Sequence, residues 1–245
     1  MIKRILVVGG ANGIGLSIAT ELATRAEVEK VYIVDKAVLS EEFSNPKFES
    51  FQFDLTNEDY SFFDSFTDIN AMMITAGFGK LALFKDIPES HIMNSFNVNT
   101  IPVLRLVHKF YGKLEAKDDF YCGVMVSIAG FMSSPFFAVY GATKAALKIF
   151  IESVNVELEK AGSTNRILNV SPGSIKGTSF NSEKTDLSQT KELANEILCH
   201  LDNKDDLFIP QFDSIFKKVL ARYQEDFREE GRHSYDYKLN SGRLK

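Results

Sequence analysis

A glycine-rich turn between an apolar strand and a helix constrains this chain more than any other feature of its sequence. Residues 2–8 are rich in strand-forming side chains, and a segment of helical period begins at Leu16. Between them, Gly9, Gly13 and Gly15 follow the spacing G-x-x-x-G-x-G. Glycines permit tight backbone angles, and a helix N-terminus presents unpaired N–H groups to an anion. The arrangement predicts a site for the diphosphate of a dinucleotide; because the spacing differs from the common G-x-G-x-x-G, a purely structural turn is the alternative.

A carboxylate at the end of the next expected strand supports the dinucleotide interpretation. Asp35 ends residues 31–35, about twenty positions after Gly15, where a dinucleotide fold places the acid that binds the adenosine ribose hydroxyls. Its charge repels a 2′-phosphate, which favours NAD over NADP. Lys36 favours NADP, because a base just past the strand can serve a 2′-phosphate, but the glycine turn itself contains no Lys or Arg. The alternative role of Asp35 is to open a solvated turn.

Composition predicts one large domain, residues 1–245. Of the 245 residues, 44% are hydrophobic, which allows a substantial core, and no Pro/Gly/Ser-rich spacer or repeat divides the chain. The formal net charge of -5 and the pI near 5.5 argue against a general affinity for nucleic acid or an anionic membrane. Strand-forming residues start almost at Met1 and no apolar run reaches roughly 18 residues, so we expect a cytoplasmic protein without a signal peptide or a membrane span.

The cysteines and histidines predict no metal site. Cys122 and Cys199 are too few for a disulfide framework and lack metal-ligand spacing. The histidines form no H-E-x-x-H or similar pair. We therefore expect a protein without a bound metal.

Short apolar runs alternate with longer segments of helical period, which predicts parallel strands joined by crossover helices. The expected fold is a doubly wound (Rossmann) α/β domain, a three-layer αβα sandwich with a mostly parallel seven-stranded sheet whose ligands bind beyond the carboxyl ends of the strands. Residues 178–200 are expected as a substrate-lid region with a mobile loop at 178–187. Residues 211–245 are expected as a C-terminal extension, with an amphipathic helix at 212–227 and then a polar tail. The expected strands are residues 2–8, 31–35, 50–53, 71–75, 123–127, 167–170 and 207–209.

A tyrosine and a lysine four positions apart are the leading candidates for proton chemistry. Tyr140 and Lys144 lie in a segment of helical period, where positions i and i+4 share a face. The ammonium can then stabilise the phenolate and lower a pKa that is ordinarily about 10. Tyr32 and Lys36 have the same spacing, but in an expected strand that separates their Cα atoms by roughly 13 Å, so we expect no proton chemistry there.

Ser127 distinguishes Tyr140 from this decoy. It lies at the carboxyl end of an expected strand in the segment just before Tyr140, so both hydroxyls can reach one substrate oxygen. With these residues the chain resembles the short-chain dehydrogenase/reductase (SDR) family from the glycine turn to about Thr178. The resemblance rests on the joint order of Gly9 to Gly15, Asp35, Asp54-Leu55, Ala76-Gly77, Asn99, Ser127, Tyr140 with Lys144, and Pro172-Gly173.

The resemblance implies a role for each matched position. Tyr140 corresponds to the catalytic acid/base, Ser127 to the residue that orients the reacting oxygen, and Lys144 to the cation that lowers the tyrosine pKa and holds the nicotinamide ribose. Asn99 corresponds to the asparagine of a water relay, with the nearby Asn97 as a competitor for that role. The implied cofactor-binding residues are Gly9, Asn12, Gly13, Ile14, Gly15, Asp35, Asp54, Leu55, Ala76, Gly77, Tyr140, Lys144, Pro172, Gly173 and Thr178.

The resulting prediction is an NAD(P)-dependent oxidoreductase that interconverts a secondary alcohol and a ketone by hydride transfer. The alternative is a catalytically inactive NAD-binding sensor or scaffold protein of the same fold. Phe131, Phe137 and Phe180 are expected to form an apolar wall for the substrate, with packing in the core or at a subunit interface as the alternative. The resemblance also implies a homodimer or homotetramer.

The chain departs from the family pattern at three positions. Val8 stands where a threonine often precedes the glycine turn, and Thr75 where an asparagine is usual before Ala76. Gly177 alters the spacing between Pro172-Gly173 and Thr178. The first two changes predict weaker support for the cofactor turn without a change in the chemistry.

Overall fold

The structure, a computed structural model, describes residues 1–178, 180 and 184–240. Within them an all-parallel seven-stranded sheet has the order β3-β2-β1-β4-β5-β6-β7. This confirms the predicted doubly wound α/β fold. The strands are β1 (Arg4–Val8), β2 (Lys30–Asp35), β3 (Phe48–Gln52), β4 (Ala71–Ile74), β5 (Tyr121–Met125), β6 (Ile167–Val170) and β7 (Leu207–Phe208).

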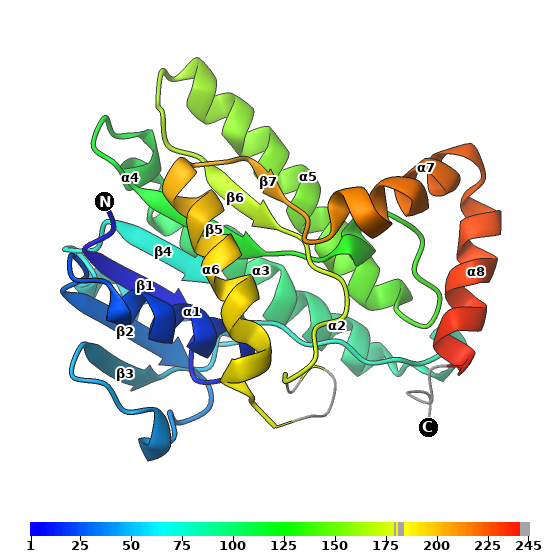
Figure 1. The fold of residues 1–245 in the computed structure, drawn as a ribbon, viewed down its shortest axis with the longest axis horizontal. Helices are drawn as coiled ribbons and strands as arrows, with labels where there is room; N and C mark the ends of the chain where they lie inside the picture. The colour runs from blue at the N-terminus through cyan, green and yellow to red at the C-terminus, as the bar shows by residue number, and fades with distance from the viewer. Residues whose placement is uncertain (179, 181–183, 241–245) are drawn as a thin grey trace.

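Helices cover both faces of the sheet and make three layers (Figure 1). Helices α1 and α6 pack together over one face, and α3, α4 and α5 contribute to the core on the other. The α-helices are α1 (Gly13–Thr24), α2 (Glu89–Asn99), α3 (Ile101–Lys109), α4 (Tyr111–Glu115), α5 (Ala138–Lys160), α6 (Leu187–Asn203), α7 (Lys217–Glu225) and α8 (Phe227–Asn240). Short 3-10 segments are η1 (Glu41–Phe43), η2 (Ser61–Ser65), η3 (Phe84–Asp86) and η4 (Ile128–Gly130), and η6 (Phe212–Phe216) is a π-helical turn.

The winding of the sheet reverses between β1 and β4. The chain moves outward from β1 through β2 to β3, then returns to the other side of β1 and continues through β4 to β7. In parallel sheets of this kind, ligands bind beyond the carboxyl ends of the strands at the reversal. The glycine turn follows β1 at this position.

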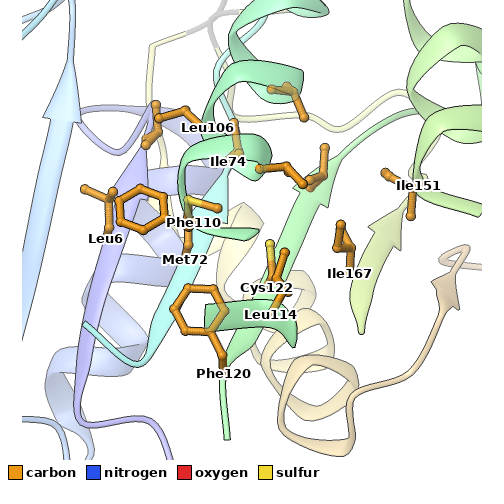
Figure 2. Packing of buried hydrophobic residues seen from close by; sticks show 14 of the residues in the cluster. Leu6, Met72, Ile74, Leu106, Phe110, Leu114, Phe120, Cys122, Ile151 and Ile167 are labelled. Atoms are coloured by element: carbon orange, nitrogen blue, oxygen red, sulfur yellow. The ribbon is translucent and has the colours of Figure 1, made fainter. Parts of the chain in front are cut away.

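Side chains that alternate along the buried strands fill the core on both faces of the sheet. Leu6, Met72, Cys122 and Ile167 form one row across four strands by register, and α3, α4 and α5 cover this row (Figure 2). Burial raises the pKa of the Cys122 thiol to about 12, so this cysteine acts as an apolar packing group.

Several predicted boundaries differ from those observed. β3 and β5 both begin two residues earlier than expected and end one and two residues earlier, at Gln52 and Met125. Aromatic side chains at Phe48 and Tyr121 extend these strands at their starts, since such residues suit a pleated surface. Ser127 consequently lies just beyond β5, in the segment that leads into η4. The last strand, β7, has only two residues, and Pro210 follows soon after.

The C-terminal region also differs from its prediction. The π-helical turn, α7 and α8 replace the single helix at 212–227, and α8 continues to Asn240 where a polar tail was expected. Asp226 separates the two helices because its backbone is extended, at φ -148 and ψ 102. We refer to α7 and α8 together as the C-terminal hairpin. It projects past the carboxyl ends of the strands (Figure 1).

The segment expected as a substrate lid is divided by the start of α6. Residues 187–200 belong to this helix, which packs against α1 through buried side chains such as Leu193 and Ile197. The part outside the helix is 178–186, of which residues 179 and 181–183 lie outside the described structure. No helix in the described part of the chain is both long and apolar enough to cross a membrane.

Candidate active site

The glycine turn is held against the end of β4 by very close backbone contacts. A Cβ on Gly9 would lie 2.4 Å from the backbone nitrogen of Ala76, and Gly9 has a φ of +86. A Cβ on Gly15 would lie 2.2 Å from the carbonyl oxygen of Gly9. These separations are far below van der Waals contact, so only glycine fits at either position. The turn therefore brings backbone amides to the N-terminus of α1.

Thr75 supports this turn directly. Its hydroxyl donates to the carbonyl oxygens of Val8 and Gly9, at 3.1 and 2.9 Å. The sequence predicted that replacing the usual asparagine here would weaken the turn. The structure shows that the threonine hydroxyl bridges these two carbonyl oxygens, whereas its effect on cofactor affinity stays a prediction.

A second hydroxyl lies at the start of α1. The Gly13 N–H donates to Oγ1 of Thr185, at 3.0 Å. Thr178 lies near the same turn, since a Cβ on Gly13 would be 3.8 Å from its side chain. Thr178 is buried, and its hydroxyl donates to the carbonyl oxygen of Ile175. The segment after β6 thus lies over the glycine turn.

Asp35 is positioned by backbone donors on both of its carboxylate oxygens. Oδ2 accepts from the N–H of Ala11, at 3.0 Å, and Oδ1 accepts from the N–H of Ala37, at 2.9 Å. The acid is therefore fixed beside the glycine turn, where the sequence placed it. Its role in this structure is to join the end of β2 to that turn.

Lys36 and Asp54 form an ion pair next to Asp35. Nζ of Lys36 lies 2.7 Å from Oδ2 of Asp54, and Thr56 donates to the other carboxylate oxygen through both its backbone and its hydroxyl. The contact with Lys36 and the Thr56 hydrogen bonds lower the pKa of Asp54 to about 2. The base that favoured NADP in the sequence is thus paired with a carboxylate.

Asn99 is fully buried and joins three elements, whereas Asn97 is exposed. Oδ1 of Asn99 accepts from the N–H of Phe78 at 2.9 Å. Nδ2 of Asn99 donates to the Phe78 carbonyl oxygen at 2.8 Å and to Oγ1 of Thr143 at 3.2 Å. Asn99 is also the last residue of α2, where the helix is interrupted before α3. Of the two candidates, it is Asn99 that connects the end of β4 to α5.

Gly77 marks where this asparagine approaches Lys144. A Cβ on Gly77 would lie 3.3 Å from Oδ1 of Asn99 and 3.4 Å from Nζ of Lys144. Lys144 itself is 2% exposed, and its Nζ donates to the carbonyl oxygen of Met125 at 2.8 Å. The lysine therefore reaches from α5 under the carboxyl ends of β4 and β5.

Ser127 and Tyr140 meet at the start of α5. Ser127 caps η4, where its Oγ accepts from the N–H of Ala129 at 3.2 Å, and it also lies 3.5 Å from the carbonyl oxygen of Pro172. Burial raises the pKa of Tyr140 to about 12, and a hydrogen bond with the Ser127 side chain opposes that shift. The serine and the tyrosine are therefore direct neighbours, as the sequence predicted.

The ionisation of Tyr140 and Lys144 differs from the sequence prediction. We expected the lysine to lower the tyrosine pKa, but desolvation raises that pKa to about 12 and lowers the pKa of Lys144 to about 7. Nζ of Lys144 lies 5.7 Å from the centre of the Tyr140 ring. Burial, which penalises the charged form of each group, is the largest cause of both shifts.

Two of the three predicted wall residues contact Tyr140. The ring centres of Phe137 and Phe180 both lie 5.2 Å from that of Tyr140, and 6.0 Å from each other. Phe131 lies elsewhere: its ring is 5.1 Å from Nζ of Lys148, one helical turn beyond Lys144. The structure therefore brings Phe137 and Phe180 to the tyrosine.

Pro172 and Gly173 lie across the site from Tyr140. The Pro172 carbonyl oxygen accepts from the N–H of Ile128, at 3.1 Å. A Cβ on Gly173 would lie 2.8 Å from the Phe216 ring, which comes from the π-helical turn before α7. The segment expected to close over a nicotinamide thus lies between η4 and the C-terminal extension.

Four other predicted cofactor positions lie near the glycine turn or against the core. Asn12 is the N-cap of α1, and Ile14 packs partly against the core below it. Leu55 and Ala76 pack partly against the core on the other face. Tyr32 and Lys36, which have the same spacing as Tyr140 and Lys144, have different partners, as expected. Tyr32 lies in β2 and hydrogen-bonds to Asp68, and Lys36 pairs with Asp54. The described residues contain no group of three or more His, Cys, Asp or Glu that could hold a metal ion.

Comparison with known proteins places this chain in one family. The model of the family described as short chain dehydrogenase matches residues 3–189. The chain belongs to the short-chain dehydrogenase family, a family of oxidoreductases. The match ends early in α6, so the C-terminal hairpin lies outside it.

Individual relatives and solved structures agree with this family. A short chain dehydrogenase/reductase of Claviceps purpurea is 26% identical over 198 residues, which cover 71% of this chain and 62% of the relative. A very-long-chain 3-oxoacyl-CoA reductase of Laccaria bicolor is 26% identical over 187 residues, which cover 67% of this chain and 53% of the relative. The chain therefore spans between about half and two thirds of the length of these two relatives.

A short chain dehydrogenase/reductase structure from Burkholderia phymatum, in complex with NAD, has the same fold. It superposes with a TM-score of 0.77 at 15% identity, over 93% of this chain and 95% of that one. An alcohol dehydrogenase from Thermococcus sibiricus, complexed with 5-hydroxy-NADP, gives 0.71 at 19% identity, over 84% of this chain and 95% of that one.

Three residues in the site were missed from the sequence. Thr75 was interpreted as a loss rather than a replacement hydrogen bond. Phe216 and Lys238 lie outside the family motifs: Phe216 is in the segment expected as an amphipathic helix, and Lys238 is in the segment expected as a polar tail, which gave no signal. Lys238 is 7% exposed, which is unusual for a lysine and could not be anticipated before the contacts of α8 were known.

Proposed function

We propose that this protein is a nicotinamide-dependent oxidoreductase that interconverts a secondary alcohol and a ketone, with Tyr140 as the acid/base. The observation that carries the proposal is that Ser127, Tyr140 and Lys144 come together at the carboxyl ends of the strands. Burial raises the pKa of Tyr140, Ser127 is close enough to oppose that shift, and Nζ of Lys144 lies 5.7 Å from the centre of the Tyr140 ring. Two hydroxyls and a lysine at one point suit the oxygen of a carbonyl group.

The chain offers a cradle that fits a dinucleotide. Gly9, Gly13 and Gly15 would hold its diphosphate on backbone N–H groups at the start of α1. Asp35 would accept hydrogen bonds from the adenosine ribose. Because Asp35 repels a 2′-phosphate and the nearby Lys36 is already paired with Asp54, we propose NAD as the preferred cofactor over NADP. When bound, the nicotinamide supplies or accepts the hydride at the substrate carbon.

The side chains have distinct parts in the proton transfer. With a pKa of about 12, the Tyr140 phenol is protonated at neutral pH and can donate its proton to a ketone oxygen. Ser127 would hold the same oxygen in line with the phenol. Lys144 is close enough to stabilise the phenolate that remains, and Asn99 fixes the end of β4 beneath it through Phe78. In the reverse direction, the phenolate would accept the proton of an alcohol.

We propose an apolar portion in the substrate. Phe137 and Phe180 pack against Tyr140, so any group attached to the reacting carbon meets aromatic rings. Such rings favour flat or branched apolar groups over charged ones. Phe131 has no part in this proposal, because it lies beside Lys148.

A screen of secondary alcohols and ketones, run in parallel with NAD and NADP, tests these proposals together. We expect turnover that is faster with NAD and with apolar substrates. The alternative, a sensor or scaffold that binds NAD without chemistry, predicts nucleotide binding by calorimetry without turnover of any substrate in the screen. Turnover only with NADP would overturn the proposed role of Asp35, and the absence of both binding and turnover would overturn the proposed function.

A further inference from the structure

The loop that carries Phe137 to Tyr140 is anchored by the C-terminal hairpin. This loop comprises residues 133–137, and we call it the 133–137 loop. The Ser133 hydroxyl donates to the carbonyl oxygen of Phe227 at 3.2 Å, where α8 begins. The rings of Phe136 and Tyr235 lie 4.5 Å apart. Contacts of two kinds therefore join the loop to α8.

Lys238 makes the densest set of contacts between the two segments. Its Nζ donates to Oγ of Ser134 at 2.7 Å and to the carbonyl oxygen of Pro135 at 2.9 Å, both in the 133–137 loop. It also donates to Oγ of Ser234, one turn earlier on α8, at 3.1 Å. An ammonium has three N–H donors, so a single lysine can serve acceptors on both segments at once. The same Nζ lies 5.5 Å from the centre of the Phe137 ring.

The 133–137 loop has a backbone that needs such support. Phe136 has a φ of +64, which is an unfavourable conformation for a bulky side chain, and it is nevertheless 7% exposed. Its carbonyl oxygen accepts from the N–H of Ala82, at 3.0 Å. A strained residue persists only when its surroundings hold it, and here those surroundings are the Tyr235 ring and the Lys238 contacts on either side.

An ion pair within the C-terminal hairpin holds α8 against α7. Glu230 is 4% exposed and pairs with Arg222 at 2.7 Å, which joins α8 to α7. At the other end of the extension, the Phe216 ring lies against Gly173, which follows the Pro172 carbonyl oxygen near Ser127. The 133–137 loop and Gly173 are therefore both packed against residues outside the part of the chain matched by the family model, residues 3–189.

We propose that Lys238 is a positioning residue that sets the size of the apolar substrate space at Tyr140. It does so by fixing the 133–137 loop, and with it the distance between Phe137 and the tyrosine. The substrate class is then a ketone or secondary alcohol with one planar apolar substituent that packs against the ring of Phe137 or Phe180 beside Tyr140. This inference rests on the proposed function for its substrate, but its anchoring part concerns the protein alone.

The test compares Lys238→Met with Lys218→Met, the same substitution at an exposed lysine of the same hairpin. The first readout is hydrogen exchange at the N–H groups of Phe137 and Ala82, which are hydrogen-bonded within or against the loop. The second is the ratio of kcat/KM for acetophenone to that for acetone. For Lys238→Met we expect about tenfold faster exchange and about a tenfold fall in the ratio, mainly through KM for acetophenone. Lys218→Met should behave as the wild type.

Other outcomes overturn the proposal. Unchanged exchange in Lys238→Met shows that the lysine does not hold the loop. Equal losses for both ketones, or the same losses in Lys218→Met, show a general effect on stability. If Lys238→Met does not fold, Ser134→Ala removes one acceptor with little change in volume and should shift both readouts in the same direction by about threefold. If the wild type turns over neither ketone, the substrate part of this inference fails, the screen above decides the proposed function, and the exchange measurement alone decides whether Lys238 anchors the loop.

Discussion

The two walls of the candidate site are built by different means. The wall at the glycine turn consists mainly of backbone, with Gly9 and Gly15 in contact with neighbouring main chain and Thr75 bridging them. The wall beside Tyr140 consists of side chains, Phe137 and Phe180, that come from two separate segments. The first wall suits a ligand part common to a whole family, and the second can change without disturbing the first. Variation in substrate and constancy in cofactor can therefore coexist in one fold.

The largest expected effect separates proton transfer from nucleotide binding. Tyr140→Phe removes the phenol oxygen and retains the ring that packs against Phe137 and Phe180. We expect turnover to fall by about a thousandfold or more, with nucleotide affinity within about threefold of the wild type. Steady-state kinetics and calorimetric titration measure the two quantities.

Tyr32→Phe is the matched control for this change. Tyr32 precedes a lysine by four positions, as Tyr140 does, but lies in β2 with its hydroxyl on Asp68. Its variant should keep wild-type turnover. Turnover in Tyr140→Phe close to that of the wild type would overturn the role proposed for Tyr140.

The next effect tests the backbone wall. Gly15→Ala places a Cβ 2.2 Å from the Gly9 carbonyl oxygen, so the turn must open. We expect a loss of stability of about 2 kcal/mol and a fall in nucleotide affinity of about a hundredfold. Thermal unfolding and calorimetric titration check these values. Gly112→Ala is the control, because its added Cβ meets nothing within 4 Å; equal effects of the two substitutions would contradict the importance of close packing at the turn.

A smaller effect is expected at the edge of the same wall. Asp35→Asn keeps an oxygen that can accept from the Ala11 N–H and removes the charge that would repel a 2′-phosphate. The preference for NAD over NADP should fall by about tenfold, as measured by the ratio of the two kcat/KM values. Asp59→Asn, at an exposed carboxylate that accepts hydrogen bonds from Ser61, should leave the ratio unchanged. An unaltered ratio in Asp35→Asn would remove the argument for NAD.

The last effect is a pH dependence of stability that arises from Lys144. Burial lowers the pKa of Lys144 to about 7 from 10.5, so between these values the unfolded chain binds more protons than the folded one. The free energy of unfolding of the wild type should therefore rise with pH from about 7 to 10, relative to Lys144→Met, by at most about 1.4 kcal/mol per pH unit. Denaturant titrations without nucleotide measure this difference. Parallel pH profiles for the two proteins would show that Lys144 is not desolvated.

The backbone wall was largely predictable from the sequence, and the side-chain wall was only partly so. The glycine turn, Asp35 and the strand ends depend on local patterns, because a strand, a turn and a helix follow one another in the chain. Asn99 and Ser127 were found through their spacing from these elements. Phe131 was misplaced, because proximity in sequence to Tyr140 does not fix which side of α5 a side chain reaches.

The shifted pKa values and the C-terminal hairpin depended on contacts that only folding reveals. The helical spacing of Tyr140 and Lys144 was correctly identified, but the degree of desolvation depends on the layers that surround them. Lys238 lies more than a hundred residues from Ser134 in the sequence. Its burial could not be foreseen from the polar composition of α8, which the sequence indicated as a tail.

If the proposed nucleotide binds at the glycine turn, the Thr185 hydroxyl that now accepts from the Gly13 N–H is a competitor for that N–H. A phosphate oxygen that takes this N–H must displace the threonine first, so the number of hydrogen bonds at that amide is the same before and after binding. The gain then comes from the charge of the phosphate, which makes a stronger acceptor than a neutral hydroxyl at the positive end of α1. If the nucleotide binds there, the Thr185 hydroxyl must leave the Gly13 N–H as the phosphate arrives. Because the incoming acceptor is charged, added salt should then weaken nucleotide binding.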